Sequence, residues 1–349
     1  MKETLKGILE NTIDEKKYIF KYPIISYRYY DQAKFLHISD EEIGKEYNVD
    51  EDIVRYNEDD SKGYTKKIYI VGGLFQKEKK EMYLELKKIR EFAKQKNIKE
   101  IALELPVKYV LENNIRELKK YGIREIILSV ISTEDEILEK NGLMYNYRDI
   151  TKAVFKIAIS FMRLSLSMII GLSNDEKEEL RAIEKVRGLK PRSVIIMQNI
   201  ILKGTENAKR FVRGNLKMLS VEENKNLLED ATRILVEKGI KDIVYLRGIQ
   251  DDIITSKYLT GVIIKDIENE ILTRMYYNYL FEKIKRLKVK NEYITIKING
   301  DIVKYIKGKE DNNLNKIKEL YYIKEIKIQN ENNNKRGKKL EIVLYNEKD

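Results

Sequence analysis

Residues 67–105, KIYIVGGLFQKEKKEMYLELKKIREFAKQKNIKEIALEL, contain the pattern that decides the fold. They begin and end with short apolar runs, KIYIVGG (67–73) and EIALEL (100–105), which predict two buried β-strands. The segment between them, 79–97, has apolar residues at helical spacing and predicts an amphipathic helix. A strand, a helix and a second strand in this order make the repeating unit of a parallel α/β fold.

The same unit recurs along the chain. Four more runs predict strands: EIILSVIS (125–132), LSLSMIIGL (164–172), SVIIMQNIIL (193–202) and DIVYLRGI (242–249). Four more segments have helical spacing, and several end in Gly after a Lys-rich last turn: 109–122, 147–161, 174–188 and 222–239. Six strands that alternate with five helices, each strand apolar on both faces, predict a parallel sheet covered by helices. An N-terminal strand within YIFKYPIISY (18–27) would complete the set.

The rhythm changes after residue 265. A long helix is expected at about 268–287, followed by a strand in NEYITIKING (291–300), helical segments, and strands in IKEIKIQ (323–329) and KLEIVLY (339–345). We therefore expect an N-terminal segment (1–65), a (β/α) barrel (66–265) and a small C-terminal α+β unit (266–349).

The composition excludes several kinds of chemistry. The 349 residues contain no cysteine and one histidine, His37. Disulfides, thiolate-bound metals and cysteine nucleophiles are therefore excluded within this sequence, and a histidine-based zinc site or catalytic triad would have one imidazole to draw on. No run of 18 residues is continuously apolar, and the charged N-terminus lacks the apolar core of a signal peptide, so we expect a cytoplasmic protein without a membrane span.

The net charge of +11 leaves two interpretations open. Surplus Lys and Arg attract nucleic acid or other anionic ligands. The 57 acidic residues and the absence of a compact Arg-rich run favour the other interpretation, a highly charged, solvated surface.

Several motifs occur in an order typical of one enzyme superfamily. They are Gly72-Gly73 at the end of a strand, the segment IREIILSVISTEDEILEKNG (123–142), Gly171-Leu172, and ILKGT (201–205) followed at a fixed spacing by LSVEE (219–223). From about Tyr18 to the end, the chain resembles radical SAM proteins related to the elongator-complex catalytic subunit and to oxygen-independent coproporphyrinogen oxidase. This resemblance implies a radical-SAM-type partial (β/α) TIM-like barrel.

The chain departs from that family at the metal site. The family's CxxxCxxC loop supplies three thiolates to a four-iron cluster that binds SAM (S-adenosyl-L-methionine). Counting without gaps from PIISYRYY (23–30) places the three positions at Asp31, Phe35 and Ile38. Asp31 and His37 could offer one oxygen and one nitrogen, which do not make a cluster site. We expect no iron–sulfur cluster and no required cofactor, and SAM binding stays open.

Three candidate sites carry two interpretations each. The resemblance implies that Gly72 and Gly73 receive the SAM amino group, but a tight turn needs glycine without any ligand. The LKGT segment would place Lys203 and Thr205 at the barrel rim, or it is simply a loop. Basic residues cluster at the end of the long helix: Lys283, Lys285, Arg286, Lys288 and Lys290. They either bind RNA phosphates or form a solvated helix surface.

The C-terminal order of strand, two helices and two strands is similar to KH-type RNA-binding modules. Those clamp the nucleic acid backbone with a Gly-x-x-Gly turn, where this chain has Gly308 and Asp311. An acidic residue at that position opposes phosphate binding, so the similarity concerns topology.

Together these features favour a radical-SAM-like pseudoenzyme that acts as a binding or interaction module, with RNA or a protein as partner. The alternative is a SAM-binding or cluster-independent enzyme of the same fold, related to tRNA modification or tetrapyrrole metabolism. The cluster loop separates the two classes, because reductive cleavage of SAM has no electron source without thiolates.

Overall fold

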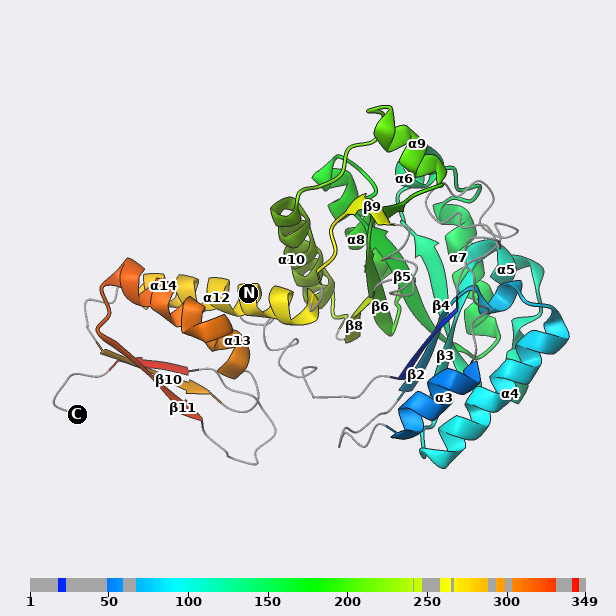
Figure 1. Cartoon of the computed structure of the whole chain (residues 1–349), viewed down its shortest axis with the longest axis horizontal. Coiled ribbons are helices and arrows are strands. Elements are labelled where there is room, and N and C mark those ends of the chain that lie inside the picture. Colours follow the sequence, from blue (N-terminus) through cyan, green and yellow to red (C-terminus); the bar gives the residue numbers. More distant parts are fainter. Residues whose placement is uncertain are drawn as a thin grey trace. The chain divides into compact units, whose positions relative to one another are not determined.

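The computed structural model describes residues 18–22, 49–58, 67–240, 242–246, 258–264, 267–287, 293–298, 303–330 and 341–344. The described residues form two compact units: those within 14–227 and 242–263 belong to one, and those within 228–241 and 264–349 belong to the other. Figure 1 shows both, in colours that follow the sequence. The boundaries expected from the sequence, at 65/66 and 265/266, stay predictions.

A seven-stranded sheet forms the first unit, in the order β1-β2-β3-β4-β5-β6-β8, and every neighbouring pair is parallel. The strand order follows the chain order, as expected when each connection is a right-handed crossover. β1 and β8 are the edges, so the sheet is an open, partial barrel. The strands are β1 (Tyr18–Tyr22), β2 (Lys67–Gly72), β3 (Glu100–Pro106), β4 (Ile123–Ile131), β5 (Arg163–Ile170), β6 (Ser193–Gln198) and β8 (Asp242–Leu246).

Helices alternate with these strands, and Figure 1 shows several of them along one side of the sheet. Apolar faces drive this arrangement: α4, for example, buries Met82, Leu86, Ile89 and Phe92. The helices of this part are α3 (Val49–Glu58), α4 (Lys79–Gln95), α5 (Val107–Glu112), α6 (Asp135–Lys140), α7 (Tyr147–Ile159), α8 (Glu176–Leu189) and α9 (Glu206–Val212), with 3₁₀ turns η1 (Gly73–Gln76) and η2 (Ile115–Tyr121). The helix α10 (Val221–Glu237) begins in this unit, and its residues from Leu228 on belong to the second unit.

The structure corrects two expected elements. The helix expected at 109–122 is interrupted, because the Asn113 side chain donates to the Tyr109 carbonyl (3.0 Å) and Asn114 caps the following 3₁₀ turn. The strand expected at 193–202 divides at Asn199. Its second part, β7 (Ile200–Leu202), pairs antiparallel with β9 (Tyr258–Gly261) in a separate ribbon.

The inner face of the main sheet, defined here as the face with Tyr69, Ala102, Ile127, Ile195 and Val244, has an apolar middle layer. All five side chains are at most 4% exposed. Since side chains alternate between faces along a strand, residues two positions before and after them share this inner face. Those positions are polar on several strands, so the apolar layer separates two polar groups.

The second unit contains a three-stranded sheet of order β11-β10-β12, with β10–β11 parallel and β10–β12 antiparallel. Its elements after residue 266 are α12 (Ile267–Leu287), β10 (Tyr293–Ile298), α13 (Val303–Lys307), η3 (Lys309–Asp311), α14 (Asn312–Tyr321), β11 (Glu325–Asn330) and β12 (Glu341–Leu344). None of the described helices has the length and apolar character that crossing a membrane requires.

Candidate functional site

A polar cluster lies on the inner face near the amino ends of the strands. Lys67 of β2 forms a buried ion pair with Glu125 of β4, and the Ser165 hydroxyl also donates to Glu125 at 2.5 Å. Ser165 and Ser193 share a hydrogen bond of 2.6 Å. In barrels of this type the amino-end face contributes stability and the carboxyl-end face holds the sites, so we assign this cluster to structure.

A second buried cluster lies near the carboxyl ends, around Glu104 of β3. The Gly72 amide donates to its carboxylate at 2.7 Å, and the Ser167 hydroxyl donates to it at 2.5 Å. Ser129 of β4 also hydrogen-bonds to it. Burial raises the pKa of Glu104 above its ordinary value, while these hydrogen bonds oppose the shift. A buried carboxyl with a raised pKa at this end of a barrel is the kind of group that can exchange a proton or hold a cation.

The Gly72-Gly73 pair joins β2 to η1. Gly72 has φ 88° and ψ −143°, a conformation that essentially only glycine adopts, and its amide is committed to Glu104. Leu74 and Phe75, which follow, are buried at 1% and 3% exposure. The turn therefore has a structural reason for glycine that is independent of any ligand.

The loop after β5 is held by a second buried carboxylate. Glu179 of α8 accepts a hydrogen bond from the Ser173 amide at 2.6 Å, and the amides of Gly171 and Leu172 also donate to it. Burial raises the pKa of Glu179 to about 7. The Asn199 side chain donates to the Gly171 carbonyl at 2.8 Å, so the loop is fixed from two sides.

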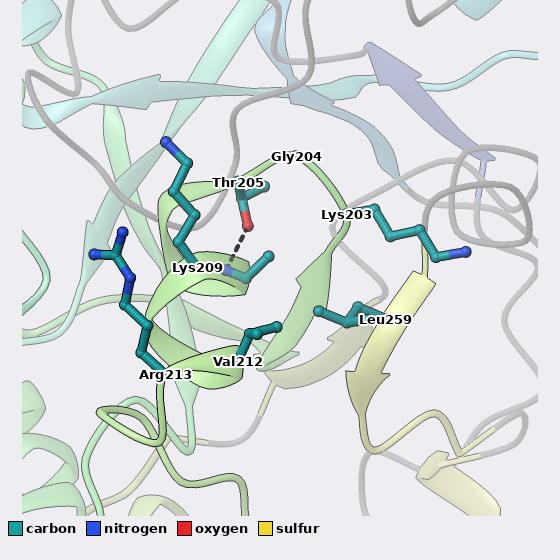
Figure 2. A pocket seen from close by; sticks show the side chains of 8 residues that line it. Lys203, Gly204, Thr205, Lys209, Val212, Arg213 and Leu259 are labelled. Atoms are coloured by element: carbon teal, nitrogen blue, oxygen red, sulfur yellow. Dashed lines mark hydrogen bonds between the residues drawn. The ribbon is translucent and has the colours of Figure 1, made fainter.

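The LKGT segment forms one wall of a hollow of about 390 Å³, shown in Figure 2. Eight described residues line it, from the end of β7, from α9 and from β9: Lys203, Gly204, Thr205, Ala208, Lys209, Val212, Arg213 and Leu259. Thr205 is fully buried and caps α9, since its hydroxyl accepts from the Ala208 amide (3.1 Å) and donates to the Leu202 carbonyl (2.8 Å). In Figure 2 the Lys209 and Arg213 side chains lie on one side of the hollow and Lys203 lies on the other, with Val212 and Leu259 between them.

The basic residues predicted on α12 do not share one face. Lys283 and Arg286 are three residues apart, whereas Lys285 lies on another face of the helix. The ammonium of Lys283 lies 5.0 Å from the Tyr279 ring centre and that of Lys285 lies 6.0 Å from the Phe281 ring centre. Lys288 and Lys290 lie outside the described residues.

The positions aligned with the cluster cysteines, Asp31, Phe35 and Ile38, also lie outside the described residues, as does His37. Within the described part of the chain, His, Asp and Glu side chains nowhere gather in a group of three that could hold a metal ion. The turn between α13 and α14 contains Gly308 and Asp311, and Asp311 forms an ion pair of 3.4 Å with Lys307.

Sequence reasoning missed Glu104 and Glu179. A signal for Glu104 was present, because a carboxylate in the middle of the apolar run EIALEL needs hydrogen-bond partners if the strand is buried. Glu179 had no such signal, since it lies among other charged residues in the first turns of an expected amphipathic helix.

No protein-family model matches the chain, and no curated protein matches it. Among solved structures, the chain is similar to the archaeal Methanocaldococcus infernus Elp3 lacking residues 1–46, with a TM-score of 0.56 and 18% identity over 78% of this chain and 64% of that chain. Coproporphyrinogen III oxidase from Escherichia coli, a radical SAM enzyme, gives a TM-score of 0.41 and 10% identity over 82% of each chain. Queuine lyase from Clostridium spiroforme, bound to SAM and queuine, gives a TM-score of 0.43 and 18% identity over 69% of this chain and 94% of that chain.

The similarity to the Elp3 structure establishes the fold, a partial (β/α) barrel of the radical SAM type with an added C-terminal α+β unit. The fold expected from the sequence is thus confirmed, together with the Elp3-like resemblance at the level of fold. The chain spans 64% of the length of that Elp3 structure.

Proposed function

We propose that this chain is a radical-SAM-like pseudoenzyme, which uses the barrel to bind a partner and carries out no cluster-dependent chemistry. The observation that supports this proposal is the absence of cysteine from all 349 residues. A four-iron cluster of this type needs three thiolates, and Asp31, Phe35 and Ile38 cannot supply them. The donor set of the sequence therefore does not fit the cluster, and without it SAM has no source of the electron that reductive cleavage requires.

The interaction role is supported by the surface rather than by the barrel interior. The net charge is +11, and the lining of the LKGT hollow combines three cationic side chains with aliphatic ones. Inside the barrel, both polar clusters are paired within the chain: Lys67 with Glu125, and Glu104 with Gly72 and Ser167.

Cluster reconstitution tests the loss of chemistry. The protein is incubated anaerobically with iron and sulfide and then with dithionite and SAM, and 5′-deoxyadenosine is measured by mass spectrometry. We expect no four-iron signal in electron paramagnetic resonance and no 5′-deoxyadenosine. The control is the variant Asp31→Cys/Phe35→Cys/Ile38→Cys, which restores three thiolates. A stoichiometric cluster in the unchanged protein contradicts the proposal.

The alternative, a SAM-binding or cluster-independent enzyme, is favoured by one observation: Glu104 is a buried carboxyl with a raised pKa next to the Gly72-Gly73 turn. Calorimetry with SAM distinguishes the two. The pseudoenzyme proposal predicts no binding in the micromolar range, and micromolar binding that Gly73→Val abolishes supports the alternative.

RNA binding by the C-terminal unit is tested in the full-length protein with Lys283→Gln/Lys285→Gln/Arg286→Gln. Binding through phosphates falls steeply with salt, and this triple variant reduces the salt dependence if α12 carries the contacts. Equal binding by both proteins at every salt concentration excludes α12 as the RNA site.

A further inference from the structure

The LKGT hollow is a preorganised surface feature. A small apolar cluster supports it from below, in which Ile201, Ala208 and Leu216 are buried and Phe211, Met218 and Leu259 pack against them. The β7–β9 ribbon fixes one wall, and the Thr205 cap fixes the start of α9, which forms the other. Little ordering is therefore needed when a ligand enters, which favours binding.

One exposed face at the end of α9 carries an apolar side chain beside two cations. Lys209, Val212 and Arg213 have the spacing i, i+3 and i+4, so they share one face of the helix. Val212 is 75% exposed, so its isopropyl group is accessible to a ligand. In Figure 2 this face lies across the hollow from Lys203 and Leu259.

The charged residues among the described lining of the hollow have a single sign. The eight described residues that line it include three cations, Lys203, Lys209 and Arg213, and no carboxylate. The apolar residues of the lining are aliphatic: Ala208, Val212 and Leu259. The complementary ligand therefore has negative groups about an apolar side chain.

The described lining residues include no aromatic ring, which favours an acidic protein segment over a nucleic acid as the ligand. Proteins hold single-stranded nucleic acid by stacking bases on aromatic rings, and the described lining offers none. Aliphatic side chains with cations on both sides instead suit a protein segment in which one apolar side chain is flanked by Asp or Glu.

We propose that the LKGT hollow docks an acidic segment of a partner protein. An apolar side chain of the partner contacts Val212 and Leu259, and its flanking carboxylates pair with Lys203, Lys209 and Arg213. This inference deepens the interaction role given under the proposed function, because it names the surface and the chemistry of the partner.

Peptide selection tests this inference. A random-peptide phage library is selected on the full-length protein and, in parallel, on the charge-reversed variant Lys209→Glu/Arg213→Glu. The control is Lys80→Glu/Lys87→Glu, which reverses two exposed cations on α4, remote in sequence from the hollow. We expect enriched peptides with an apolar residue between acidic ones, bound at least about tenfold more weakly by the charge-reversed variant and equally by the control. Val212→Asp, with circular dichroism to confirm folding, should weaken the same peptides.

Three outcomes overturn the inference: no enrichment on the unchanged protein, enriched peptides without acidic residues, and equal binding by the charge-reversed variant. Displacement of the peptides by a uridine oligomer at equal concentration would instead identify the hollow as a nucleic acid site. These outcomes are independent of cluster reconstitution, so failure here leaves the pseudoenzyme proposal untouched, and a reconstituted cluster leaves the peptide result standing.

Discussion

The buried Glu179 should make the stability of this protein depend on pH near neutrality. Its pKa rises from an ordinary 4.5 to about 7 in the folded state, chiefly because burial disfavours the charged form. The folded protein therefore holds a proton between these two pH values that the unfolded chain has released. Stability is highest below the unfolded pKa and falls as the pH rises through the folded pKa.

The size of this effect on the free energy of unfolding follows from the difference of about 2.5 between those two pKa values. At about 1.4 kcal/mol for each unit, the proton contributes about 3 kcal/mol, most of which is lost between about pH 5 and about pH 8. Because Glu179 is 3% exposed, solvent screening reduces this figure little.

The assay is urea unfolding of the protein and of Glu179→Gln over that pH range. The variant cannot ionise at this position, so its free energy of unfolding should fall by about 3 kcal/mol less than that of the unchanged protein. Other titrating groups, including Glu104, act in both proteins and cancel in the difference. Parallel pH profiles for the two proteins would refute the assignment of the raised pKa to Glu179.

Gly72→Ala should lower the free energy of unfolding by about 1 kcal/mol or more, because φ 88° strains any side chain, and unchanged urea midpoints would contradict this. Glu104→Ala should lower the free energy of unfolding by about 3 kcal/mol, since it leaves the Ser167 hydroxyl and the Gly72 amide without their acceptor. Glu104→Gln keeps an acceptor and should lower it by about 1 kcal/mol. Equal losses for the two variants would argue against this hydrogen-bond explanation. Lys67→Met should lower the free energy of unfolding by roughly 3 kcal/mol, because it removes the close partner of the buried Glu125 carboxylate and leaves, among the described residues, only the longer ion pair with Arg192 (3.7 Å). Lys67→Met/Glu125→Leu should recover most of that loss in thermal unfolding.

The sequence by itself determined the elements and their class. Alternation of short apolar runs with helix-periodic segments is local information, because burial of both faces of a strand is written in its own residues. The runs that begin at Lys67 and Glu100 became β2 and β3 with starting positions as expected. The absence of cysteine is likewise complete in the sequence, and it bears on function without any structure.

Only the tertiary structure decided which polar residues meet. Glu104 lies 63 residues from Ser167 and 32 from Gly72, and no local pattern connects them. The same holds for the strand expected at 193–202. It divides at Asn199, whose side chain donates to the Gly171 carbonyl just beyond β5, and β7 then pairs with β9, which lies more than 50 residues further along the chain. Residue propensity and apolar periodicity indicate which helix or strand a segment forms. A site depends in addition on strand register and on the crossovers between distant segments. Both become fixed only when the sheet assembles.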